Sequence, residues 1–171
     1  MRIYIPATLS MLQQLVTDGS LRPVSGTAFA VTPKLREAYA EGDEDELGEV
    51  ALREAALASL RLLAGAAEDS GQLGEELPPR RAGLVADVGD VTLRPDLDDA
   101  VVRIGAPVTT DDVVAAFVDN AAAEAQVKAA VEVIDEADLG DEDAELTVGD
   151  AQDHDLAWYA VQELPFLLEL L

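Results

Sequence analysis

The chain has no cysteine among its 171 residues and only one histidine. The absence of thiols excludes disulfide bonds, thiolate catalysis and zinc or iron–sulfur sites held by cysteine. The sequence also lacks a phosphate-binding loop and a Gly-x-Gly-x-x-Gly run, so no motif supports nucleotide binding. We therefore expect no cofactor and no metal site in this protein.

Positive charge and aromatic side chains are both scarce. Eleven basic residues stand against thirty-five acidic ones, for a formal net charge of −24, and aromatic residues make up 4% of the chain. A protein this acidic repels nucleic acid, whose binding requires basic contacts to phosphates. The charge has three explanations, namely a solvated surface set by biased composition, adaptation to high salt, or mimicry of nucleic acid toward a basic partner.

Long apolar runs are absent as well. No stretch approaches the roughly eighteen apolar residues that a membrane span requires. The chain opens on a strand-like run, without the charged and apolar segments of a secretion signal. We therefore expect a cytosolic protein that makes no membrane contact. The length suits one domain with a sizeable core, built mainly from Ala, Val and Leu.

The first elements predicted are a strand and a helix. Residues 3–5 are β-branched or aromatic, as is typical of a strand, and Pro6 ends the strand because it cannot donate to a ladder. Thr8 is then placed to cap a helix that Gly19 terminates. Apolar residues at helical spacing predict the buried stripe of this helix: Leu9, Leu12, Leu15 and Val16.

A second strand and two helices follow. The alternating run 26–33 predicts a strand, after which Thr32 caps a short helix with Pro33 at its first position. Residues 43–67 predict the longest helix, which Asp43 caps. Glycines and prolines then mark a long loop: Gly71, Gly74, Pro78 and Pro79.

The second half of the chain contains more strand-like runs. Residues 82–88 and 101–104 predict strands, and residues 91–93 are left open. Residues 113–118 fit either a helix or a buried strand, and the strand is preferred because six apolar residues follow one another without interruption. Residues 156–163 are also ambiguous, and a strand followed by a final helical turn is preferred there.

A helix and an acidic segment lie between the last two of these runs. Asp119 or Asn120 caps a helix that continues through Ile134. Residues 135–145 are rich in carboxylates and hold little apolar surface for packing. They predict an acidic flexible loop that extends to about residue 150.

Together these elements predict a single α/β domain. Its centre is a mixed sheet of about five strands, with helices packed on it and helix 43–67 as the largest cover. The order and direction of the strands stay open.

Three stretches carry a family resemblance: RIYIPATL at 2–9, AFAVTP at 28–33, and WY at 158–159 followed by QEL at 162–164. They are similar to an uncharacterised family of small actinobacterial proteins, and the likeness covers most of the chain. The resemblance implies a cytosolic bacterial protein of unknown function. It supplies no catalytic residues.

Two local patterns suggest a chemical role, although a purely structural role explains each of them better. The acidic start of helix 43–67, with Glu54 at the twelfth position, copies the spacing of a calcium-binding loop, but Leu47 occupies a position where a ligand is required. A capped helix explains this segment instead. His154 lies between two aspartates in the sequence, and it is the candidate for a catalytic acid or base. The alternative is that it marks the end of a helix or strand.

The ends of the predicted strands offer a candidate ligand site. Thr8, Thr32 and Asp119 each follow a strand and begin a helix, and in a parallel sheet these positions meet at the edge where α/β proteins bind ligands. Helix N-terminal amides there could hold a small anion. The alternative is that all three residues are ordinary caps.

The C-terminal segment is unusually apolar for a chain end. Five of its last six residues are apolar: Phe166, Leu167, Leu168, Leu170 and Leu171. They either complete the core or cover a partner, which would be an identical subunit or an unidentified protein. The function predicted is therefore a non-catalytic cytosolic binding or assembly protein. An enzyme or small-molecule binder at the strand ends is one alternative, and an acidic mimic that binds a basic partner is the second.

Overall fold

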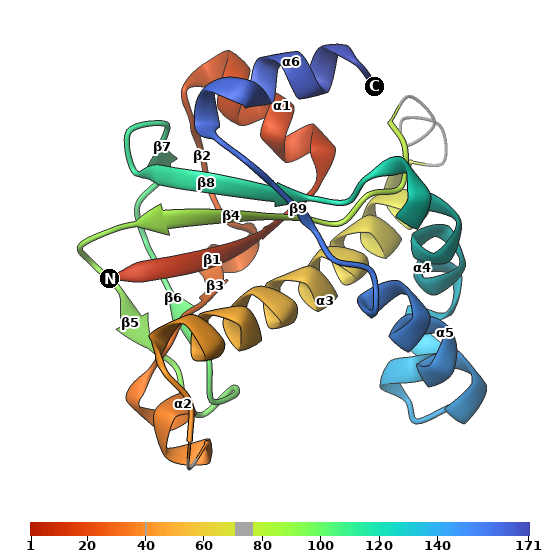
Figure 1. The fold of residues 1–171 in the computed structure, drawn as a ribbon, viewed down its shortest axis with the longest axis horizontal. Helices are drawn as coiled ribbons and strands as arrows, with labels where there is room; N and C mark the ends of the chain where they lie inside the picture. Colours follow the sequence, from red (N-terminus) through yellow and green to blue (C-terminus); the bar gives the residue numbers. More distant parts are fainter. Residues whose placement is uncertain (40, 71–76) are drawn as a thin grey trace.

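A seven-stranded antiparallel sheet forms the centre of the computed structural model, which describes residues 1–39, 41–70 and 77–171 (Figure 1). Its strands run in the order β5-β6-β3-β1-β4-β8-β9. Their bounds are β1 Arg2–Ala7, β3 Thr27–Phe29, β4 Ala82–Asp87, β5 Thr92–Leu93, β6 Val101–Arg103, β8 Val113–Val118 and β9 Ala157–Tyr159. A separate two-stranded sheet pairs β2 (Ser20–Leu21) with β7 (Val108–Thr109).

The α/β class is confirmed, but the predicted sheet is wrong in two respects. Among the described residues every strand pair of the sheet is antiparallel, so the sheet is not mixed, and it holds seven strands rather than about five. The outermost strands, β5 and β9, have only two and three residues. Strands that short carry no periodic pattern, and strand direction depends on pairing between distant segments, which composition does not encode.

The helices cover both faces of this sheet (Figure 1). Helices α1 and α6 pack on one another over one face, and α3 packs on β1, β3 and β4 across the other. Helices α4 and α5 form a hairpin against α3. The bounds are α1 Leu9–Asp18, η1 Val24–Gly26, α2 Pro33–Ala38, α3 Glu44–Ser70, η3 Ala121–Ala123, α4 Glu124–Asp138, α5 Glu142–Gln152, η4 Val161–Glu163 and α6 Leu164–Glu169.

The predicted caps of α1, α2 and α3 are confirmed, whereas α3 and α4 continue past their predicted ends to Ser70 and Asp138. The Thr8 hydroxyl accepts from the amide of Met11, and Gly19 closes α1 with a left-handed φ of 78°. Thr32 caps α2, and Asp43 caps α3 by accepting from the amide of Glu46 at 2.9 Å. The loop predicted at Gly71 and Gly74 lies outside the described residues.

Alternation along the strands gives the two sheet faces different cores. Ile3, Ile5 and Leu84 face α1 and α6. Leu9, Leu12 and Leu15 of α1 are buried as predicted, whereas Val16 is 40% exposed. On the other face, Phe29 and Val101 pack on α3, and a third cluster joins the far half of α3 to α4 and α5.

The acidic segment is helical, so the predicted flexible loop is wrong. Helix α4 continues to Asp138, Gly140 turns the chain with φ 96°, and Asp141 caps α5. Small buried residues hold α5 against α4: Ala144, Val148 and Ala151. Acidic residues in the first turn of α5 also complement the positive end of its dipole.

Residues 113–118 form β8, as preferred. Of the run 156–163 only Ala157–Tyr159 is a strand, β9, and residues 161–163 form η4 before α6 begins. Among the residues described, no helix has the length and apolar character to cross a membrane.

Helix α3 approaches the sheet closely at two glycines. A Cβ atom on Gly48 would lie 2.7 Å from the Tyr4 hydroxyl oxygen, and one on Gly83 would lie 3.3 Å from Leu52 Cδ1. Contacts below 3.0 Å require an atom to move, so Gly48 sets the depth at which α3 rests on Tyr4.

This contact predicts different effects for two glycine substitutions in the same helix. Gly65→Ala should stabilise the protein by roughly 0.5–1 kcal/mol, because a Cβ there meets no atom within 4 Å and alanine favours a helix. Gly48→Ala should lose this gain, since the Tyr4 ring must shift, and should recover it in a Tyr4→Phe background. Urea denaturation of the four variants measures the coupling. Equal gains at both glycines in the Tyr4 background would contradict the packing described.

Candidate functional site

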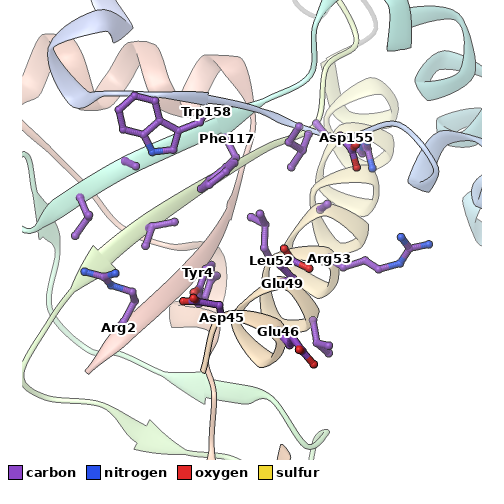
Figure 2. A pocket seen from close by; sticks show the side chains of 18 of the residues that line it. Arg2, Tyr4, Asp45, Glu46, Glu49, Leu52, Arg53, Phe117, Asp155 and Trp158 are labelled. Carbon is purple, nitrogen blue, oxygen red and sulfur yellow. The ribbon is translucent and has the colours of Figure 1, made fainter. Parts of the chain in front are cut away.

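A groove of about 650 Å³ lies beside α3, over the half of the sheet made by β4, β8 and β9 (Figure 2). Helix α3 packs on β1, β3 and β4, and in the described part of the chain no helix covers β8 and β9 on this side. The groove is therefore a consequence of where α3 crosses the sheet.

Aromatic residues form one wall of the groove. Phe117 of β8 and Trp158 of β9 are directly paired across the two strands, and Figure 2 shows their rings beside each other. Trp158 is 58% exposed although it is the only tryptophan in the chain. A cross-strand aromatic pair of this kind stabilises a sheet, but here it also presents a wide apolar surface to solvent.

The floor of the groove is apolar and follows an irregularity in the sheet. Val85 and Ala115 are buried beneath it, and Leu52 of α3 closes one side. The pairing of β4 with β8 shifts register between Val85 and Ala86, so that Val114 has no partner on β4 and is 41% exposed. Such bulges turn an additional side chain toward one face.

Charged residues line the other side. Asp45, Glu46 and Glu49 come from the first turns of α3, and Asp155 precedes β9 (Figure 2). Asp45 and Glu49 are four residues apart, so they share one face of the helix.

At the open end of the groove Arg2 holds Asp87 with two hydrogen bonds of 3.0 and 3.1 Å. These bonds keep the pKa of the Asp87 carboxyl below its usual value. Burial raises the pKa of the neighbouring Tyr4 hydroxyl, and the charge of Arg2 opposes that rise. The ion pair therefore leaves little free positive charge at this end.

A buried ion pair lies behind the groove. Arg81 and Asp119, at 1% and 0% exposure, contact each other through Nη2 and Oδ1 at 2.7 Å and through Nε and Oδ2 at 2.8 Å. The Arg81 amide also donates to Asp119 at 2.8 Å. The pair therefore joins the start of β4 to the end of β8.

The same arginine positions the segment that leads to Trp158. Its Nη1 donates to Gln152 Oε1 and its Nη2 donates to the His154 carbonyl, both at 2.8 Å. Gln152 in turn donates through Nε2 to the Arg53 carbonyl at 3.2 Å. These bonds connect the end of α5 and the approach to β9 with α3, so they fix both walls of the groove.

Ser59 adds a second buried connection. Its hydroxyl donates to the Ala7 carbonyl at 2.6 Å and accepts from the Ala82 amide at 3.1 Å. The side chain is fully buried. Through it, α3 is tied to the end of β1 and the start of β4.

The three residues predicted at the strand ends are not brought together. β1 and β8 both run antiparallel to β4, so Thr8 and Asp119 lie toward one edge, whereas β3 runs antiparallel to β1 and places Thr32 at the opposite edge. The Thr8 and Thr32 hydroxyls cap helices, and Thr32 also donates to the Asp99 carbonyl. Asp119 is buried against Arg81, and Asn120 caps η3 in its place. The parallel arrangement that supported a shared ligand site is absent.

Two other features singled out in the sequence, His154 and the acidic start of helix 43–67, both lie at the groove. His154 lines the groove, and the acidic start of helix 43–67 is a capped helix whose Asp45, Glu46 and Glu49 line the same groove. No group of three or more His, Cys, Asp or Glu side chains among residues 1–39, 41–70 and 77–171 is placed to hold a metal ion.

The C-terminal residues divide between core and surface. Leu167 is buried with Leu164 in the core shared with α1, and Leu168 and Leu171 pack against that core. Phe166 and Leu170 are 67% and 85% exposed. The segment therefore completes the domain, and part of it stays on the surface.

Sequence reasoning did not find the groove. Phe117 and Trp158 are far apart in sequence and meet only through the pairing of β8 with β9. The sequence did contain one signal, because the chain is poor in aromatic residues and has a single tryptophan.

Comparison with known proteins gives one match. The model of a family of unknown function, DUF6912, matches residues 1–168. The curated proteins and the solved structures gave no match to this chain.

The buried ion pair predicts a large stability effect. Asp119→Ala should lower the free energy of unfolding by about 3–5 kcal/mol, because it leaves Arg81 charged and unpaired in the interior. Asp138→Ala, which breaks the half-exposed pair with Arg61, is the control and should change it by less than about 1 kcal/mol. Urea denaturation compares the two. Similar losses from both substitutions would show that the buried network does not fix the groove walls.

Proposed function

We propose that this chain, which belongs to the DUF6912 family of unknown function, is a non-catalytic cytosolic binding protein that takes a segment of another protein into the groove beside α3. The Phe117–Trp158 pair, in which Phe117 is half-buried and Trp158 is 58% exposed, is the observation that supports this most directly. Tryptophan and other aromatic residues in such positions supply most of the binding energy of many protein interfaces.

The distribution of aromatic residues supports a binding surface. Only 4% of the chain is aromatic, yet Tyr4, Phe117 and Trp158 all line this groove. Large aromatic side chains normally contribute to a core, where burial of their surface is most favourable. Their placement over an uncovered half of the sheet leaves apolar area that a partner would remove from water.

The exposure of the lining favours a chain segment over a small molecule. Small-ligand sites bury 70–90% or more of the ligand, in about 300–1,000 Å³ of concave volume. The groove has a suitable volume, but Trp158 is 58% and Val114 is 41% exposed. A small molecule would keep much of its surface in water, whereas an extended segment could cover these side chains along the groove.

The polar groups of the groove support binding more than catalysis. The carboxylates of α3 project from the surface of the helix, and the His154 carbonyl is held by Arg81. A catalytic acid or base must lie within hydrogen-bond reach of a second functional group or the substrate. The described hydrogen bonds of the groove instead hold backbone segments in place.

The single tryptophan makes the proposal directly testable. Random peptides displayed on phage should yield binders that shift the emission of Trp158 saturably, since no other residue contributes tryptophan fluorescence. Phe117→Ala should weaken such a peptide by about tenfold or more, as expected for a central aromatic contact. Phe166→Ala, the same change at an exposed phenylalanine on α6, should leave the affinity unchanged.

Two results would reject the proposal. One is a selection that yields no peptide able to change Trp158 emission. The other is a set of binders that Phe166→Ala weakens and Phe117→Ala does not.

A second candidate function is self-association through α6. Phe166 and Leu170 are both exposed and lie one helical turn apart, so they form a small apolar patch at the C-terminal end. An identical subunit that covers this patch would explain the apolar chain end.

Sedimentation velocity tests this second candidate. If the patch joins two subunits, the sedimentation coefficient should rise with protein concentration, and Phe166→Ser/Leu170→Ser should abolish that rise without unfolding the chain. A wild-type protein that sediments as a monomer at every concentration would show that α6 is not a dimer interface.

A further inference from the structure

We propose that the segment bound in the groove is basic, and that its arginine or lysine side chains stack on the Phe117–Trp158 pair and face carboxylates from α3 and the approach to β9. This inference rests on the proposed function, since it names the chemistry of the partner that the groove would bind.

Two of the three arginines that line the groove are paired with carboxylates. Arg2 pairs with Asp87, and Arg81 pairs with Asp119. Arg53, the third lining arginine, donates to the Gln152 carbonyl at 3.4 Å.

The negative charges are mostly free. Glu44 pairs with Arg36. Asp45, Glu46, Glu49 and Asp155 form no salt bridge within the part of the chain that the structure describes. The lining therefore carries more unpaired negative charge than positive charge.

Helix capping does not account for all of this charge. Acidic residues in the first turn of a helix stabilise its positive end, which explains Asp45 and Glu46. The effect falls off beyond the first turn, and Glu49 lies in the second turn of α3. Asp155 lies outside any helix, two residues before β9. Two of the lining carboxylates are therefore unexplained by helix stability.

Aromatic faces and carboxylates together select a cation. A guanidinium or ammonium group over the face of a tryptophan is attracted by the negative face of the ring. The alkyl part of an arginine or lysine would at the same time cover the apolar floor, where Val114 is exposed. A basic side chain therefore matches both surfaces of the groove, whereas an acidic one matches neither.

The charge of the whole molecule favours the same class of partner. A formal net charge of −24 attracts basic proteins at long range and repels acidic ones. Nucleic acid and anionic membrane surfaces are repelled for the same reason. A second copy of this chain carries the same charge, so it is a poor occupant for a groove lined by free carboxylates.

Peptides of defined charge test the inference. Hexa-arginine should change Trp158 emission saturably in about 0.15 M salt, and hexa-glutamate should not. Calorimetry should show that Asp45→Asn/Glu49→Gln weakens hexa-arginine by about tenfold. Trp158→Leu should also weaken it, because the stacking surface is lost.

A charge-matched variant separates the groove from the general field. Asp135→Asn/Glu136→Gln on α4 removes the same charge from exposed positions outside the groove. It should change the affinity by less than about twofold. Thermal melts of both double variants confirm that each is folded.

Each contrary outcome has a distinct meaning. Equal weakening by the two double variants would show that only the overall field attracts the peptide, and would overturn the inference. Binding of hexa-glutamate or duplex DNA at the groove would overturn it too. If hexa-arginine fails while neutral peptides selected on phage still bind through Phe117, the basic partner is wrong and the proposed function stands. If no peptide binds at all, both are wrong.

Discussion

The buried pair of Arg81 and Asp119 is the interaction on which the rest of the structure depends. It joins β4 to β8, and the remaining Arg81 donors hold Gln152 and the His154 carbonyl. A charge this deeply buried is tolerable only when its partners are all present. The network therefore positions the end of α5 and the start of β9 together, and Trp158 is placed as a consequence.

The position of α3 is the second constraint, and it explains why a groove exists at all. Gly48 of α3 lets the helix lie close to Tyr4 of β1, and Gly83 of β4 leaves room for Leu52 of α3. A helix held there cannot also cover β8 and β9. Because α4 and α5 pack against the far half of α3 rather than on the sheet, Trp158 remains exposed and Phe117 beside it is only half-buried.

Local signals predicted the individual elements well. Thr8, Thr32 and Asp43 are caps because their side chains can accept from the next turn. The uninterrupted apolar run 113–118 is a strand buried on one face, with a bulge that exposes Val114. These features depend on neighbouring residues, which the sequence displays directly. The helix at 142–152 was missed because its stripe of small residues is hidden among carboxylates.

Features that depend on distant pairing were not predictable in this way. Arg81 meets Asp119, and Phe117 meets Trp158, only after the strands have paired in a particular order and direction. Thr8, Thr32 and Asp119 would share one edge only if their strands were parallel. Antiparallel pairing places Thr32 at the opposite edge and joins Phe117 to Trp158. The position of the groove therefore could not be derived from the sequence, in which the single tryptophan was the one signal that pointed to it.

Quenching of Trp158 fluorescence by charged ions probes both the exposure and the charge of the groove, and it needs neither a partner nor a variant. In the proposed groove the only tryptophan is exposed and surrounded by negative potential. Relative to its quenching of free N-acetyltryptophanamide at equal ionic strength, caesium should therefore quench Trp158 more effectively than iodide does. A relative quenching by iodide that equals or exceeds that by caesium would contradict the negative potential, and resistance to both ions would contradict the exposure.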